Sequence, residues 1–144
     1  MNENKNNNFK IILEYIKDLS IETPSATTLL FVRNNIKNYH MDIDISSLVL
    51  KNKSLEITTK LTLQDKNNNK NKAFFEIKYA SVISIDPEVT EKKIISKIVL
   101  CDLQKIIYPK IKNIFLNLIE KSGYPNIKIE KEIDFEKMYN DKFN

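Results

Sequence analysis

Few side chains in this sequence could carry out chemistry, and their spacing does not favour catalysis. The 144 residues include a single histidine, His40, and a single cysteine, Cys101. A catalytic histidine needs a nucleophile and an orienting carboxylate nearby. Asp42 lies two residues from His40, but no nucleophile accompanies the pair, so the pattern favours a solvated surface histidine. One histidine and one cysteine also cannot make a zinc site of the usual kinds. The sequence therefore predicts neither an enzyme nor a metal site.

The same scarcity bears on cofactors and on the compartment. Gly123 is the only glycine, whereas phosphate-binding loops and dinucleotide fingerprints need several, so we expect no cofactor. A lone Cys101 cannot form an intrachain disulfide and is expected to pack as a small apolar group in a reducing cytoplasm. The sequence contains no run of 18 apolar residues, the length needed to span a bilayer, so no direct membrane insertion is expected. The asparagine-rich start is unlike a signal peptide.

The more informative pattern is an acidic patch with one aromatic residue. Asp18 and Glu22 fall in the polar phase of an alternating segment, about 13 Å apart at roughly 3.3 Å per residue. Phe74 and Glu76 share the polar phase of a later alternating segment. Such a patch suits a basic, partly apolar peptide. Ordinary surface charge with one exposed phenylalanine fits the pattern equally well.

Four alternating segments must position these residues. Apolar residues alternate with polar ones over 9–21, 39–45, 55–63 and 75–85. Four half-buried strands without an intervening helix predict an antiparallel sheet. The lysine- and asparagine-rich segment 66–72 is interpreted as a solvated hairpin loop.

Beyond the fourth segment, apolar residues recur every three or four positions, which predicts a helix over 94–119. Asp86 and Pro87 form a favourable helix start, and Gly123 a stop. Pro109 should kink or split this helix. A second, short helix is expected over 135–139. The fold class is thus α+β, with residues 1–8 disordered and 9–144 forming a single domain.

The predicted helix is apolar around more of its circumference than one sheet can cover. Leu100, Phe115, Leu116 and Ile119 widen its apolar stripe. We therefore expect a second copy of the chain to cover the remainder.

Several segments resemble the SecB family of protein-export chaperones. Residues 17–26, K-D-L-S-I-E-T-P-S-A, match the family hallmark K-D-(I/L)-S-x-E-x-P-x-A. Further similar segments follow in the family's order, namely 41–44, 73–77, 82–85, Tyr108-Pro109, 123–125 and the ending 127–135 with its Ile127-x-Ile129. The resemblance covers about residues 9–141.

This resemblance implies a SecB-like fold and a homotetramer, a dimer of dimers built through helices. It also implies an ATP-independent chaperone that holds unfolded secretory precursors and delivers them to the translocation motor SecA. By matching positions, the resemblance places SecA docking at Asp18, Glu22, Phe74 and Glu76. No motif fixes the client groove. The candidates are aromatic and methionine side chains, which adapt to varied apolar clients, namely Phe31, Tyr39, Met41 and Tyr79.

The chain departs from SecB proteins in its charge. Its formal net charge is +4, and an acidic C-terminal tail is nearly missing. One alternative is a SecB-like chaperone dedicated to a single client, such as an antitoxin. Another is a nucleic-acid-binding module, but Arg33 is the only arginine and the lysines are scattered. We therefore expect no nucleic-acid partner.

Overall fold

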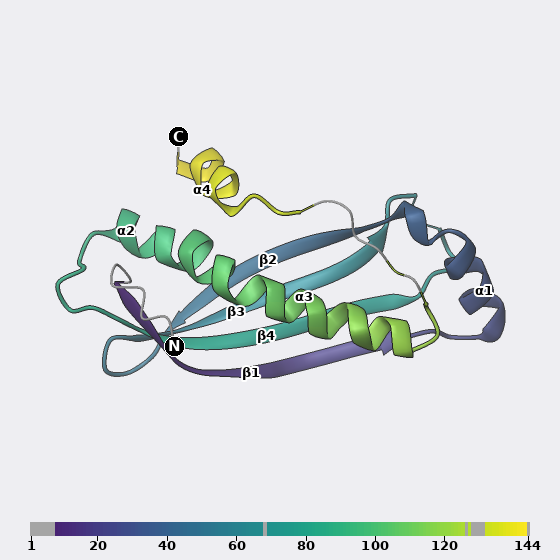
Figure 1. The fold of residues 1–144 in the computed structure, drawn as a ribbon, viewed down its shortest axis with the longest axis horizontal. Coiled ribbons are helices and arrows are strands. Elements are labelled where there is room, and N and C mark those ends of the chain that lie inside the picture. Colours follow the sequence, from purple (N-terminus) through teal and green to yellow (C-terminus); the bar gives the residue numbers. More distant parts are fainter. Residues whose placement is uncertain (1–7, 68, 126, 128–131, 144) are drawn as a thin grey trace.

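The computed structural model describes residues 8–67, 69–125, 127 and 132–143 as one sheet, with a long helix along one of its faces and a short helix beyond the ends of the strands (Figure 1). Most of the predicted N-terminal segment 1–8, and Ile129 of the C-terminal motif, lie outside these residues. The elements in chain order are β1 (Phe9–Glu22), α1 (Ala26–Asn34), the short 3-10 helix η1 (Ile36–Asn38), β2 (Tyr39–Val49), β3 (Ser54–Asp65), β4 (Phe74–Ile85), α2 (Lys92–Lys97), η2 (Ile98–Asp102), α3 (Leu103–Lys121) and α4 (Phe135–Phe143).

The four strands form an antiparallel sheet in the order β1-β4-β3-β2, as the alternating segments predicted. In this order, β1 and β2 are the two edge strands of the sheet. Odd-numbered residues of β3 and β4 point to the helices and form the core with α3, including the fully buried Ile57, Phe75 and Ile77. The even-numbered residues of these strands lie on the opposite side, called here the open face.

Two irregularities in β1 change which of its side chains reach the open face. The register against β4 shifts between Ile11 and Leu13 and again between Ile16 and Asp18. Leu13 pairs with Val82, and Tyr15 with Ala80, both on the open face. The prediction that these two residues belong to the buried phase is therefore wrong. Each β-bulge adds one residue, which reverses the side to which the following residues point.

Glu14 takes the place on the helix side that the sequence assigned to apolar residues. The Tyr79 hydroxyl donates to Glu14 Oε1 at 3.2 Å, and Lys110 Nζ lies 3.2 Å from Glu14 Oε2. The carboxylate therefore connects β1 to β4 and α3, and its burial is compensated by these partners.

The long helix is continuous from α2 through η2 to α3, and it runs along the sheet (Figure 1). Its irregular turn is a π-helical segment, η2, and α3 continues through Pro109 without splitting there. Within this turn, the Gln104 side-chain amide donates to the Val99 carbonyl at 3.3 Å. Gln104 also exchanges hydrogen bonds of 3.0 and 3.2 Å with Thr59 of β3. This buried pair fixes the helix against the sheet.

Asp86 does not begin the helix as predicted. Its carboxylate accepts a hydrogen bond from the Glu88 backbone and its carbonyl one from Val89, so Asp86 closes a turn after β4. The helix begins at Lys92 instead. A short polar side chain followed by proline suits a turn as well as a helix start.

The chain itself covers most of the apolar helix surface. Phe115 and Ile119 are fully buried. The rings of Tyr108 and Phe135 meet edge to face at 5.3 Å, so α4 packs against α3. The exposed apolar side chains instead gather on the edge strand β1, namely Ile12, Leu13, Tyr15, Ile16 and Leu19. The expected second copy stays a prediction, and the larger exposed apolar surface lies on β1 rather than on the long helix.

Candidate functional site

The four residues of the acidic patch lie together on the open face. Glu22 pairs with Phe74 across β1 and β4, and Ser20 pairs with Glu76. Phe74 is 44% exposed, which is unusual for a phenylalanine in a strand. Asp18 is one step further along β1. The sequence correctly placed these side chains on one solvent-facing surface.

Lysines that the sequence did not single out are interspersed with these carboxylates. Asp18 pairs directly with Lys78, and Lys60 Nζ lies 3.8 Å from Glu76 Oε1. Asp42 and Asp44 of β2 extend the acidic surface across the sheet, since Asp44 pairs with Lys60. Pairing between strands brings these charges together, and no spacing within one segment reveals it.

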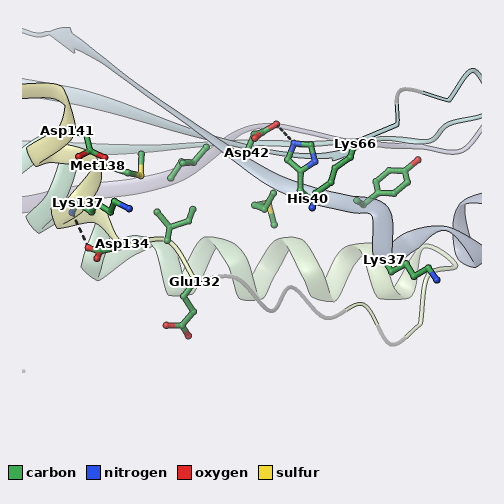
Figure 2. A pocket seen from close by; sticks show the side chains of 13 residues that line it. Lys37, His40, Asp42, Lys66, Glu132, Asp134, Lys137, Met138 and Asp141 are labelled. Atoms are coloured by element: carbon green, nitrogen blue, oxygen red, sulfur yellow. Dashed lines mark hydrogen bonds and ion pairs between the residues drawn. The ribbon is translucent and has the colours of Figure 1, made fainter.

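A groove runs along the helix side of β2 (Figure 2). Its volume is about 1000 Å³, and its apolar lining comes from β2 and from the C-terminal part of the chain, namely Tyr39, Met41, Ile43, Ile133 and Met138. A smaller hollow of about 190 Å³ shares Ile43 and Met138 and continues past Ile45 to Leu100. Alternate side chains of β2 thus provide an apolar wall along this edge of the sheet.

Charged side chains of both signs border the groove. Lys37 and Lys66 lie toward one end, and Asp134, Lys137 and Asp141 lie around Met138 at the other (Figure 2). Asp134 also caps α4, because its Oδ1 accepts a hydrogen bond from the Lys137 backbone at 3.1 Å. The cap holds Met138 of α4 beside the groove.

Only part of the predicted groove set lies here. Tyr39 and Met41 line the groove, and the Tyr39 ring meets Phe75 edge to face at 6.0 Å. Burial raises the pKa of Tyr39, so its ring is a neutral part of the wall. Phe31 is half-buried in α1, and Tyr79 is buried beside Glu14, so neither lines the groove. The sequence missed Ile133 and Met138, whose only local signal is the Asp134 cap between them.

Of the residues considered for chemistry, His40 and Asp42 are in contact, and Cys101 is buried in η2. His40 Nε2 lies 3.2 Å from Asp42 Oδ2 at the border of the groove, and both side chains are partly exposed. Cys101 is fully buried, as predicted, and burial raises its pKa, which disfavours the reactive thiolate. The described residues hold no cluster of three or more histidine, cysteine or acidic side chains suited to a metal ion. Within the same residues, no helix is long and apolar enough to cross a membrane.

Comparisons with known proteins agree on one family. Residues 2–144 match the family described as preprotein translocase subunit SecB. A putative protein-export protein SecB of Pelagibacter ubique is 47% identical over 137 residues, which are 95% of this chain and 98% of the relative. A protein-export protein SecB of Bartonella quintana is 23% identical over 131 residues, covering 91% and 81% of the two chains.

A solved structure has the same fold. It is a SecB-like chaperone of Mycobacterium tuberculosis in complex with a peptide from an antitoxin, with a TM-score of 0.64, 11% identity and 88% of each chain covered. The predicted SecB-like α+β fold is thereby confirmed.

Proposed function

The chain belongs to the SecB family of protein-export chaperones, and on this basis we propose that it holds unfolded precursors in the cytoplasm, without ATP, and delivers them to SecA. The observation that supports holding is the groove along β2. An unfolded segment presents apolar side chains at intervals along its length. The alternate apolar residues of β2 can contact such side chains without requiring one particular client sequence. Met41 and Met138 suit this role because their flexible side chains adapt to varied partners.

An aggregation assay tests the holding function. The protein is expected to slow aggregation of a denatured secretory precursor at near-stoichiometric ratios with no nucleotide present. Replacing Met138 with glutamate places a charge in the groove and should weaken protection. Ile94→Glu is a matched control, because Ile94 is similarly exposed but does not line the groove. Aggregation unchanged by a several-fold excess of the wild-type protein would count against the proposal.

The open face supplies the proposed docking site for SecA. Asp18, Glu22, Phe74 and Glu76 combine carboxylates with one exposed aromatic side chain, which suits a basic, partly apolar partner. Asp18→Lys removes an attraction and adds a repulsion while leaving the core untouched. Affinity for SecA should fall by about tenfold or more, roughly 1.4 kcal/mol.

Calorimetry at low salt measures this effect, and added salt should reproduce part of the loss. Glu120→Lys is the control, since Glu120 is an exposed carboxylate on α3. Client protection should survive both substitutions. If Asp18→Lys leaves the affinity for SecA intact, the patch is ordinary charged surface.

The proposed assembly is a homotetramer, a dimer of dimers. Its support is the apolar surface of β1, an edge strand whose outer backbone has no neighbouring strand in the described residues. An open apolar edge is a place where a second strand can pair.

A chaperone dedicated to one client is the second candidate. It is favoured by the solved SecB-like chaperone, which is in complex with an antitoxin peptide. Recovery of a single antitoxin with this protein from its own cells would support the dedicated role, whereas recovery of many precursors would support general export.

A further inference from the structure

The two β1 bulges create an apolar strip at one end of the open face. Leu48, Glu56, Val82 and Leu13 form one continuous row across the four strands. Leu48 is 58% and Leu13 48% exposed. At about 4.8 Å per strand, the row spans roughly 14 Å. Without the bulge before it, Leu13 would point toward the helices instead.

Tyr15 widens this strip and donates a hydrogen bond to the only carboxylate in its row. It pairs with Ala80 in the next row, and its hydroxyl donates to Glu56 on β3, so the ring must cross β4. Ala80 is fully buried although it lies on the open face, which agrees with a ring above it. Lys17 Nζ also lies 3.4 Å from Glu56. The carboxylate within the strip is thus already hydrogen-bonded and paired, and the exposed apolar side chains of Leu13, Tyr15 and Leu48 lie around it.

The charges on the open face are distributed unevenly on the two sides of the strip. The rows toward Phe74 carry five carboxylates and only two lysines, namely Asp18, Glu22, Asp42, Asp44 and Glu76 with Lys60 and Lys78. Lys10 lies on the other side of the strip, in the row with Ser84 and Ser54. These rows therefore have a surplus of three carboxylates, whereas the chain as a whole has a formal net charge of +4.

We propose that this strip is a second contact surface on the open face, for a segment that carries a cluster of apolar side chains followed by basic ones. The apolar cluster of this partner segment would contact Leu13, Tyr15 and Leu48. Its basic end would reach the carboxylate of Glu76, close to Phe74. Val82 and Glu76 are six residues apart, which is about 20 Å at roughly 3.3 Å per residue. Lys10 disfavours the reverse orientation. The inference deepens the proposed docking of a basic partner and rests on it.

Fluorescence anisotropy with a designed peptide tests the strip. The probe is a labelled peptide with a run of leucines followed by a run of lysines, long enough to span about 20 Å when extended. The binding variant is Leu13→Ser with Leu48→Ser. Leu30→Ser is the matched control, because Leu30 is 59% exposed on α1, away from the sheet. Circular dichroism confirms that each variant is folded.

We expect the double variant to bind the peptide at least tenfold more weakly, a change of about 1.4 kcal/mol, and the control to bind within twofold of wild type. A peptide with glutamates in place of lysines should also bind at least tenfold more weakly. Three results would overturn the inference: no binding by the wild-type protein, equal loss in the control, or intact peptide binding with an altered oligomeric mass, which would assign the strip to contacts between copies.

One comparison distinguishes a failure of the strip proposal from a failure of the docking proposal. If Asp18→Lys weakens SecA binding but the double serine variant leaves peptide binding intact, the docking proposal stands and the strip is refuted. If neither substitution has an effect, both are refuted.

Discussion

The buried hydrogen bonds of Gln104 should contribute a large share of the stability of the helix–sheet contact. Gln104 is fully buried, exchanges two hydrogen bonds with Thr59 and donates to the Val99 carbonyl. Gln104→Leu keeps a similar volume but leaves the Thr59 hydroxyl and the Val99 carbonyl without this partner. An unsatisfied buried polar group costs about 1–3 kcal/mol. We therefore expect a loss of about 2–4 kcal/mol in the free energy of unfolding.

A double-mutant cycle separates the pair from its surroundings. Thr59→Val alone should also destabilise, because it leaves the Gln104 amide with only the Val99 carbonyl. The combination of Gln104→Leu and Thr59→Val should cost less than the sum of the single changes, by about 1–2 kcal/mol. Thr58→Val, on the open face, is the control and should stay within about 0.5 kcal/mol.

Urea unfolding followed by circular dichroism gives these free energies. All variants must be compared at one protein concentration, because the stability of an oligomer depends on it. A change below about 0.5 kcal/mol for Gln104→Leu, or strict additivity in the cycle, would refute the assigned role of the pair.

Three further predictions concern other parts of the molecule. Gly123 has a φ of +112°, and a Cβ there would lie 3.1 Å from Leu29 Cδ1, so Gly123→Ala should destabilise the fold by about 1–3 kcal/mol in urea unfolding; no change would show that the turn relaxes. The hydrogen bond from Tyr15 lowers the pKa of Glu56 below its ordinary value, so its stabilisation is present above the ordinary carboxyl pKa and is lost as the pH falls through the lowered one. Tyr15→Phe should raise the pKa of Glu56 in an NMR titration, and an unchanged pKa would contradict the hydrogen bond. Light scattering should give the mass of four chains of 16.9 kDa at tens of micromolar, whereas a monomer mass would contradict the proposed assembly.

The sequence predicted the sheet because β2, β3 and β4 each keep one phase from end to end, with no register shift between them. It could not give the side of Leu13 and Tyr15, because their orientation depends on two extra residues accommodated opposite β4. Ile12 and Ile16 interrupt the alternation there, and this was the only local sign of the bulges. The order of apolar and polar residues within one strand does not show whether that strand or its neighbour bulges to accommodate an extra residue.

The candidate site was predictable where one strand carries it and not where several elements meet. Asp18, Glu22, Phe74 and Glu76 alternate correctly within their own strands. Lys60 and Lys78 enter the same surface only through cross-strand pairing. The groove depends on α4, whose position beside β2 no period within the C-terminal segment could indicate.

Because Cys101 is buried, its reaction with a thiol reagent can measure how fast this part of the chain opens locally. A thiol reagent can reach this side chain only when η2 separates from the sheet and α4, so the rate of modification in native buffer reports how often that happens. Cysteines introduced on the surface would react first and could be labelled without removing the native one. A bound client that holds the long helix against the sheet should slow the reaction of Cys101, whereas a client that loosens it should accelerate the reaction.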